Sequence, residues 1–244
     1  MKNIIHSTRL IVKKLANILF PAQCIGCSSY LEDPHILCSK CKPNIPTESG
    51  LYCTVCEKRL SSFATCHTSP LDAIGYATSY QVSLMRDLIH LYKYEQVTSI
   101  VIDLSNIFIS YLDTSGLLSF LTSKENNVVI TPIPLHTLRE RTRGFNQSKL
   151  LANLVAQHYC LPLYDILIRT QNNPPQAQMK SKEKRIKNAE HLFVLKPEAT
   201  HVIKNKTILL VDDVATSCAT LASAAKILKH DGAKKVIGII LAKG

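Results

Sequence analysis

This sequence predicts an α/β protein in which a parallel sheet flanked by helices follows a small cysteine-rich domain. From residue 71 onward, β-branched runs alternate with amphipathic stretches of helical spacing, the pattern of parallel strands joined by helical crossovers. Before residue 71 lie seven of the nine cysteines, in a segment with little long apolar periodicity. So short a segment needs a staple, because it cannot bury enough apolar surface by itself. We therefore expect an N-terminal amphipathic helix over 1–22, a cysteine-rich domain over 23–70 and an α/β domain over 71–244.

The N-terminal stretch is predicted to be a surface helix rather than an export signal or a membrane span. Lys13 and Lys14 interrupt its apolar region, and no small-residue cleavage site follows. Nowhere does an apolar run approach the roughly 18 residues that a membrane span needs. We expect the helix to dock on the protein's own body, with a membrane surface as the alternative, and the protein to be cytoplasmic without integral membrane contact. Its apolar positions follow helical spacing, at Ile4, Ile5, Leu10, Ile11, Leu15, Ile18 and Leu19.

Two CxxC pairs predict a structural zinc site. Cys24 and Cys27 form the first pair, Cys38 and Cys41 form the second, and ten residues separate the pairs. Each pair makes a tight turn that points two thiolates at one centre, so two turns supply tetrahedral four-sulfur coordination. In a chain without an export signal, such pairs indicate a metal in a reducing compartment rather than disulfides. Four sulfur ligands leave no open position, which makes the expected Zn²⁺ structural rather than catalytic.

A second metal site is less complete in the sequence. Cys53 and Cys56 form a third CxxC pair and Cys66 follows, but Ser69 stands where a fourth ligand would be expected. His67 could substitute, although adjacent residues seldom both reach one metal. The alternative is a degenerate half-site held by packing. The remaining two cysteines are isolated and are not expected to be ligands.

The α/β domain is expected to contain four strands and the helices between them, assigned from hydrophobic periodicity. Residues 170–191 are polar, basic and proline-containing, which predicts an exposed mobile loop. In chain order the other elements are a strand over 72–80, helices over 83–94 and 99–114, a strand over 127–134, a helix over 148–160, a strand over 206–213, a helix over 219–233 stopped at Gly232, and a strand over 235–243.

The positive charge is concentrated in one segment. The chain has a formal net charge of +11, and residues 71–244 hold 21 Lys and Arg against 14 Asp and Glu. Within that region, the segment 139–187 alone holds 10 basic and 3 acidic residues, so the rest of it is balanced. We expect this segment to face an anionic partner, such as a phosphate, a pyrophosphate or a nucleic-acid backbone.

The strongest functional signal is ILLVDDVATSCAT at 208–220. An open parallel sheet binds its ligand beyond the carboxyl ends of its strands, and Asp212 and Asp213 would repel each other there unless a hydroxyl or a cation satisfied them. Small and hydroxyl-bearing residues then lead into a helix, whose N-terminal amides suit a phosphate monoester. Carboxylates for a sugar beside amides for its phosphate predict a ribose 5-phosphate pocket. The plain alternative is a capped helix after a strand.

These residues resemble a known family. VDDVATSCAT is similar to the 5-phosphoribosyl 1-pyrophosphate (PRPP) motif of type I phosphoribosyltransferases, in which a glycine usually stands at the position of Cys218. PIPLHTLRERTRGFNQ at 132–147, LIHLYKY at 88–94 and the double CxxC start resemble the ComF family of competence proteins and their gluconate-utilisation relatives. The resemblance extends over about residues 16–244. It implies a zinc ribbon followed by a type I phosphoribosyltransferase-like fold, and a role in handling incoming single-stranded DNA during natural transformation.

The resemblance also implies roles for individual residues. Asp212 and Asp213 would hold the ribose and, with it, Mg²⁺. The arginine-rich loop would hold the leaving pyrophosphate, because arginine fits phosphate oxygens in a bidentate fork; Arg143 is the strongest of its candidates. Lys93 would reach the pocket, and the loop over 170–191 would form a mobile hood that excludes water. The expected ligand contacts are Ala215, Thr216, Ser217, Cys218, Ala219 and Thr220 in the phosphate loop, Arg139, Arg141 and Arg143 in the arginine loop, and Gln176, Lys182, Arg185 and Asn188 in the hood.

Three functions remain open from the sequence. The first is an enzyme that transfers phosphoribose from PRPP to an acceptor with Mg²⁺, in which the protein mainly positions the substrate and stabilises the departing pyrophosphate. The second is a non-catalytic binder of PRPP, nucleotides or single-stranded DNA that works with DNA-processing proteins. The third is a zinc-ribbon scaffold with an inert second domain. Aromatic residues make up 6% of the chain and tryptophan is absent, so a base-stacking platform is poorly supported.

Overall fold

The computed structural model describes residues 22–31, 35–61, 66–94, 98–172 and 192–244. Nearly all of the helix expected over 1–22 and most of the loop expected over 170–191 lie outside the described residues. The hood candidates Gln176, Lys182, Arg185 and Asn188 lie outside them as well. In the parts of the chain that the structure covers, no helix is both long and apolar enough to cross a membrane.

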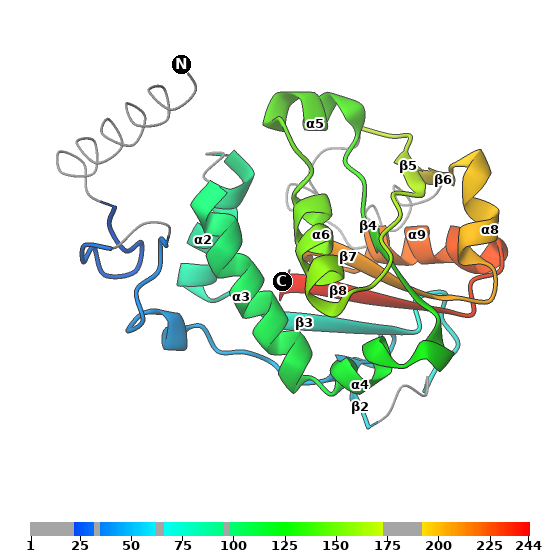
Figure 1. Cartoon of the computed structure of the whole chain (residues 1–244), viewed down its shortest axis with the longest axis horizontal. Helices are drawn as coiled ribbons and strands as arrows, with labels where there is room; N and C mark the ends of the chain where they lie inside the picture. The colour runs from blue at the N-terminus through cyan, green and yellow to red at the C-terminus, as the bar shows by residue number, and fades with distance from the viewer. Residues whose placement is uncertain (1–21, 32–34, 62–65, 95–97, 173–191) are drawn as a thin grey trace, which may run out of the picture.

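A six-stranded sheet with the strand order β2-β1-β3-β8-β7-β4 forms the centre of the molecule (Figure 1). The strands β7 and β8 are buried along most of their length, as expected where helices cover both faces of a parallel sheet. The predicted parallel sheet flanked by helices is therefore present. Its parallel part consists of β3 (Ala73–Ser79), β8 (Lys235–Lys243), β7 (Thr207–Ala215) and β4 (Val128–Pro132).

Each face of the sheet carries its own apolar core. Four helices cover one face, namely α2 (Ser83–Tyr94), α3 (Thr98–Thr114), α4 (Leu117–Thr122) and α6 (Gln147–Tyr159). The other face is covered by α8 (Thr200–Ile203), α9 (Ala219–His230) and the antiparallel pair of β5 (Leu167–Arg169) and β6 (Phe193–Leu195). The short helix α5 (Thr137–Arg143) follows β4 and stands beyond the sheet, at the top of Figure 1. The loops around α5 and α9 therefore belong to one end of the sheet.

The strand β7 extends two residues further than the sequence indicated. The expected end was Asp213, but β7 continues to Ala215, which pairs in register with Lys243 of β8. The two aspartates consequently lie within β7, near its end, rather than at its last residues. Pairing with β8 explains the difference, because the long partner strand offers hydrogen bonds beyond the acidic residues.

The cysteine-rich segment joins the sheet directly. Its strands β1 (Leu51–Tyr52) and β2 (Arg59–Leu60) pair antiparallel with each other, and Tyr52 of β1 is the register partner of Ile74 in β3. The expected boundary at residue 70 therefore falls between strands of one continuous sheet. The aromatic rings of Tyr52 and Tyr76 stack with centroids 4.9 Å apart across this junction.

A buried carboxylate of α3 binds the segment between the first two CxxC pairs. Asp103 of α3 is 2% exposed. One of its oxygens accepts a hydrogen bond from His35 Nδ1 at 2.9 Å, and the other accepts from the backbone N–H groups of Ile36 and Leu37 at 2.8 and 3.1 Å. The side chain of Leu37 packs in the same core as Asp103's own helix. This carboxylate therefore orients the segment between the CxxC pairs.

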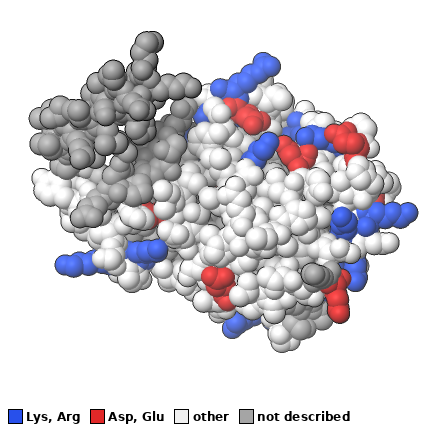
Figure 2. Space-filling view, in the orientation of Figure 1, with Lys and Arg blue, Asp and Glu red and all other residues white. Residues whose placement is uncertain are grey.

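Charge on the visible face of the molecule is mixed. Figure 2 shows lysine and arginine side chains interspersed with acidic ones near the margins, and few charges in the middle of this face. Among the ten basic residues of the segment 139–187, the five lysine and arginine residues between 180 and 187 lie outside the described residues. The expectation that this segment carries the positive field therefore stays a prediction.

Candidate functional site

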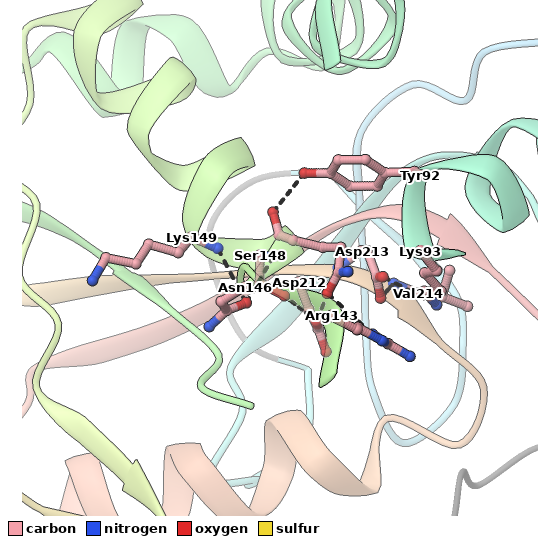
Figure 3. A network of polar contacts seen from close by, with 10 residues as sticks. Tyr92, Lys93, Arg143, Asn146, Ser148, Lys149, Asp212, Asp213 and Val214 are labelled. Atoms are coloured by element: carbon pink, nitrogen blue, oxygen red, sulfur yellow. Dashed lines mark hydrogen bonds and ion pairs between the residues drawn. The ribbon is translucent and has the colours of Figure 1, made fainter. Parts of the chain in front are cut away.

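The carboxyl ends of the four parallel strands lie at one end of the sheet, which we call its carboxyl edge. Candidate residues from three segments gather there. β7 leads into α9 at this edge, and β4 leads into α5 and α6. In open α/β sheets, ligands bind beyond this edge. Figure 3 shows the aspartates of β7 together with Lys93 of α2, Arg143 of α5 and Ser148 of α6.

Asp212 is held by a hydroxyl group. The Oγ of Ser148 donates to Asp212 Oδ1 at 2.7 Å, and the backbone N–H of Asp213 donates to the same oxygen at 2.9 Å. Burial and then the neighbouring charge of Asp213 raise the pKa of Asp212 to about 7, and the hydrogen bond from Ser148 opposes that shift. A carboxyl group with such a pKa changes its charge near neutral pH.

Asp213 is held by a cation. Lys93 Nζ lies 3.0 Å from Asp213 Oδ2, and the N–H of Val214 donates to Asp213 Oδ1. Asp213 is 8% exposed, so the lysine compensates a carboxylate that is largely removed from water. The family resemblance implied that Lys93 reaches the pocket, with a surface lysine as the alternative, and the structure places Lys93 in an ion pair with Asp213. The requirement for a hydroxyl and a cation beside the two acids is met by Ser148 and Lys93.

The phosphate loop keeps the backbone shape that its motif implies. Cys218 is the N-terminal cap of α9, with φ 55° and ψ 7° and no side-chain capping hydrogen bond. This is the left-handed conformation that glycine adopts without cost, so cysteine occupies it here at the expense of some strain. The side chain of Cys218 packs partly against the core beneath α9, and this burial raises the pKa of its thiol. Beside it, the Oγ of Ser217 is buried without a hydrogen-bond partner in the described residues.

The arginine loop contributes unequally. It forms the helix α5, which leaves Arg141 exposed and Arg139 and Arg143 half-buried. Arg143 Nη1 donates to the side-chain oxygen of Gln147 at 3.0 Å. That hydrogen bond fixes Arg143 beside the start of α6, whereas Arg141 points into solvent.

Arg169 of β5 is a site residue that sequence reasoning missed. Burial and then the charge of Arg139 lower the pKa of the Arg169 guanidinium, while Asp212 acts in the opposite direction. The guanidinium lies 5.8 Å from the ring centroid of Phe193 and donates from Nε to the carbonyl of Gln171. Arg169 therefore adds positive charge to the environment of Arg139 and Asp212. A three-residue strand carries no periodicity from which this position could have been inferred.

Gln147 and Thr131 are two further residues that the sequence did not single out as ligand contacts. Gln147 is 1% exposed, its backbone carbonyl accepts from Tyr92 Oη at 2.8 Å, and its Nε2 has no hydrogen-bond partner within the described chain. Thr131, near the end of β4, is completely buried and its Oγ1 likewise has none there. With Ser217, these are the three buried side-chain polar atoms without a partner in the described residues. All three belong to segments that end at the carboxyl edge of the sheet.

Both cysteine clusters fit a tetrahedral metal. Tetrahedral zinc with bonds of about 2.3 Å to sulfur separates its sulfurs by about 3.8 Å. In the first cluster the four Sγ atoms lie within 4.8 Å of one another, and those of Cys27 and Cys38 are 3.6 Å apart. The four ligand residues are those predicted, Cys24, Cys27, Cys38 and Cys41. Zn²⁺ bound there would cross-link two turns that lack a large core of their own.

The second cluster is complete because His67 joins it. The sequence left His67 open as a substitute ligand, because adjacent residues seldom both reach one metal. In the structure Cys66 Sγ and His67 Nδ1 are 3.2 Å apart, and both lie within 4.8 Å of the Sγ atoms of Cys53 and Cys56. The imidazole therefore supplies the fourth ligand atom that the serine at position 69 cannot. Three thiolates and one imidazole are a common structural zinc set.

Comparisons with known proteins agree with this architecture. Residues 146–244 match the family model described as phosphoribosyl transferase domain, and residues 15–69 match that of a double zinc ribbon domain. Competence protein F of Haemophilus influenzae is 26% identical over 82% of this chain and 93% of its own length. Competence protein ComFC of Bacillus subtilis is 29% identical over 80% of this chain and 79% of its own. The DNA utilization protein YhgH of Escherichia coli K12 is 26% identical over 87% of this chain and 86% of its own.

Proposed function

We propose that this chain is a member of the ComF family, that it binds PRPP with Mg²⁺ at the carboxyl edge of its sheet, and that it acts in the uptake and handling of DNA. The relatives that it resembles along most of its length are named as competence and DNA utilization proteins. The phosphoribosyltransferase model covers the part of the chain that contains both the acid pair and the phosphate loop. The carboxylates, hydroxyl groups and basic side chains at the carboxyl edge support PRPP as the ligand.

The observation that carries the proposal is the set of unpartnered buried polar atoms in the segments that border the carboxyl ends of the parallel strands. Buried polar groups in native proteins nearly always have hydrogen-bond partners, and each exception calls for a physical reason. Thr131, Gln147 and Ser217 come from three different segments, yet each lies at the end of a strand or the start of a helix that borders the carboxyl edge. A ligand rich in oxygen atoms would supply the missing partners.

We assign the parts of PRPP to the parts of the edge by charge and donor type. The carboxylates of Asp212 and Asp213 would accept from the ribose hydroxyls. The loop from Ala215 to Thr220 would hold the 5′-phosphate through backbone N–H groups and hydroxyls at the start of α9. The pyrophosphate would lie against the guanidinium groups, with Arg143 first, Arg139 second and Arg141 in a peripheral role; Arg185, which the resemblance also implies, lies outside the described residues. Lys93 would release Asp213 in part when the ribose arrives.

Magnesium fits the donor set of this edge. Mg²⁺ is bound in such sites by one or two carboxylates together with substrate phosphates and water, and Asp212 and Asp213 offer the carboxylates. When bound, the ion would neutralise charge on the pyrophosphate. Ser148 would keep the carboxylate of Asp212 oriented, and Lys93 would limit the repulsion between the two acids.

If phosphoribose is transferred, the contribution of the protein is positioning and electrostatic stabilisation. Asp212 and Asp213 would orient the sugar, and Arg143 would stabilise the negative charge that develops on the leaving pyrophosphate. Arg143 is prepared for this role because its hydrogen bond to Gln147 fixes its direction before the ligand binds. No side-chain nucleophile is required by this chemistry.

A non-catalytic DNA-handling adaptor is the second candidate. It is favoured by the printed names of the relatives and by the formal net charge of +11. A cationic protein binds the phosphate backbone by releasing counterions from it. Its affinity therefore falls steeply as the salt concentration rises. Fluorescence anisotropy with a single-stranded oligonucleotide at 50 and 300 mM salt separates this candidate from one in which DNA plays no part: a complex indifferent to salt would contradict it.

Isothermal titration calorimetry with PRPP, with and without Mg²⁺, tests the first function. We expect binding that depends on Mg²⁺ and that weakens about 10- to 100-fold in Asp213→Asn, as for the loss of a charged hydrogen-bond acceptor. Asp113→Asn, an exposed acid on α3, serves as the matched control and should bind as the wild type does. The proposal is wrong if the wild type gives no heat under conditions in which an orotate phosphoribosyltransferase does.

A further inference from the structure

The second cysteine cluster reaches the phosphate loop through one ion pair. Glu57 follows Cys56 directly, and its carboxylate Oε1 lies 3.3 Å from Lys243 Nζ at the end of β8. Glu57 is held by the cluster's own turn, in which its N–H donates to the carbonyl of Cys53 at 3.0 Å and its φ is 58°. The side chain of Lys243 is 19% exposed and that of Glu57 is 74% exposed. The cation is therefore sheltered, while its partner lies mostly in water.

Lys243 lies at the base of the phosphate loop. It is the register partner of Ala215, the residue at which the loop begins. The next residue, Gly244, donates its N–H to the carbonyl of Ala215 at 3.0 Å, and a Cβ at Gly244 would lie 3.2 Å from Cγ2 of Thr216. The end of β8 and the start of the loop are thus in direct contact.

The lysine side chain has a fixed position between the loop and the aromatic pair of the sheet edge. Its Nζ lies 5.6 Å from the ring centroid of Tyr76, which stacks on Tyr52 of β1. Its charge also acts at the loop, because Lys243 lowers and Glu57 raises the pKa of Cys218, against a larger effect of burial. A sheltered ammonium group close to a loop of N–H donors and hydroxyls forms a site for an anion.

We propose that Lys243 is a binding residue for the phosphate monoester held by the Thr216–Thr220 loop, and that Glu57 competes with that phosphate for the same ammonium group. This inference rests on the proposed function, since it takes the loop as a phosphate site. An exposed carboxylate holds a lysine weakly, so a dianionic phosphate beside the loop amides displaces Glu57 from Lys243. The cysteine-rich segment thereby contributes to the ligand affinity of the α/β domain.

A purely structural ion pair between Lys243 and Glu57 makes a different prediction. In that case removal of either partner affects the protein in the same direction, through the loss of one contact between two segments. Competition requires opposite effects, because loss of the lysine removes a ligand contact whereas loss of the glutamate removes a competitor. The two single substitutions therefore separate the two explanations.

The test is calorimetric titration of four variants with two probes in the presence of Mg²⁺. The variants are Lys243→Met and Glu57→Gln, together with Lys235→Met and Glu125→Gln as controls. Lys235 is at the opposite end of β8, and Glu125 is an exposed acid on the turn before β4. The probes are PRPP, which carries the 5′-phosphate, and inorganic pyrophosphate, which does not.

We expect Lys243→Met to weaken PRPP binding about 10- to 100-fold and to leave pyrophosphate binding unchanged. Glu57→Gln should tighten PRPP binding about 2- to 5-fold, the scale of an exposed ion pair. Both controls should match the wild type with both probes. If Lys243→Met folds poorly, Glu57→Gln alone still decides the question by the sign of its effect.

The inference is overturned if Lys243→Met binds PRPP as the wild type does, or if Glu57→Gln weakens PRPP binding. An equal loss of PRPP and pyrophosphate affinity in Lys243→Met would also overturn it, because the lysine would then not act on the 5′-phosphate. This failure is distinct from failure of the proposed function, in which the wild type itself does not bind PRPP.

Discussion

A cysteine occupies the left-handed turn at the start of α9, where the related motif has a glycine. The backbone of Cys218 keeps the conformation that glycine favours, with φ 55° and ψ 7°. The loop shape is therefore preserved and only a Cβ and a thiol have been added. What the substitution changes is the closeness with which a phosphate can approach the backbone.

Cys218→Gly should tighten PRPP binding about 2- to 10-fold, because it removes the Cβ that limits this approach. Cys218→Ala keeps the Cβ and lacks the thiol, so it should bind as the wild type does. Calorimetric titration of both variants measures the difference. Equal gains in the two variants would assign the effect to the thiol, and no gain in either would show that the natural loop is already open enough.

The raised pKa of Asp212 predicts a particular dependence of stability on pH. An unfolded aspartate titrates near pKa 3.9, whereas burial, followed by the charge of Asp213, raises the pKa of Asp212 in the folded protein to about 7. Between these values the folded state holds a proton that the unfolded chain has released, so this group lowers the free energy of unfolding as pH rises from about 4 to about 7. Lys93 and Ser148 reduce the effect without reversing it.

Asp212→Asn cannot ionise and should lack this loss. Relative to the wild type, its free energy of unfolding should increase by about 2 kcal/mol between pH 5 and pH 8, as measured by urea denaturation. Asp113→Asn, which replaces an exposed acid, should follow the wild type across the same range. A constant difference between Asp212→Asn and the wild type would mean that Asp212 has an ordinary pKa.

Single residues show where sequence reasoning reached its limit. Asp212 and Asp213 could be singled out, because two acids at the end of a strand are visible in a local pattern, whereas Lys93 was suggested only by the family resemblance. Ser148, Gln147 and Arg169 could not, since each acquires its meaning only from a residue far away in the chain, as Ser148 does from Asp212, 64 positions later. His67 stayed an open alternative in the sequence, and only the fold of its turn shows that it lies beside the three cysteines.

At the scale of elements, α3 does more than cover the sheet. Its buried Asp103 accepts three hydrogen bonds from the segment between the two CxxC pairs. The hydrophobic pattern of α3 predicted its helix but not this role, because an acid in an apolar stretch looks the same whether it is exposed or buried. The partners of the carboxylate come from residues 66 to 68 positions earlier in the chain.

Asp103→Leu should release this segment from α3. An aliphatic side chain offers no acceptor, so the N–H groups of Ile36 and Leu37 lose the oxygen that they share, at a cost of about 2 kcal/mol. Hydrogen exchange at the amides of Ile36 and Leu37 should become faster, while exchange in β7 stays unchanged. Asp113→Leu on the same helix is the control. Unchanged protection at Ile36 and Leu37 would show that the metal cluster alone orders the segment.

At the scale of the molecule, the two cysteine clusters and the sheet form one connected structure. The parallel sheet and its helices followed from periodicity, and the zinc-binding character of the first segment followed from CxxC spacing. The pairing of β1 with β3 did not, because two-residue strands leave no pattern in a sequence. Strands on either side of the predicted boundary at residue 70 belong to one sheet, since β1 pairs with β3.

Removal of zinc by a chelator should therefore have a graded effect. The turns around Cys24 to Cys41 should lose structure, because metal binding supplies their folding free energy, and hydrogen exchange should accelerate there and in β1. The amides of β7 and β8 should stay protected, since these strands pair with each other and the core on the α9 face contains none of the cluster cysteines. Exchange that accelerates equally in all segments would refute the independence of the sheet.

The pairing of β1 with β3 has a consequence for the order of synthesis. In the folded sheet β3 lies between β1 and β8. The residues of β8 follow those of β3 about 160 positions later in the chain, as in the pair of Ala73 with Ile237. Until the ribosome has released β8, β3 is a strand without its parallel partner, and exposed strand edges promote aggregation. β1 and β2 precede β3 in the chain and leave the ribosome first. The antiparallel pair of β1 and β2 is thus available to cover one side of the nascent β3 until β8 is synthesised.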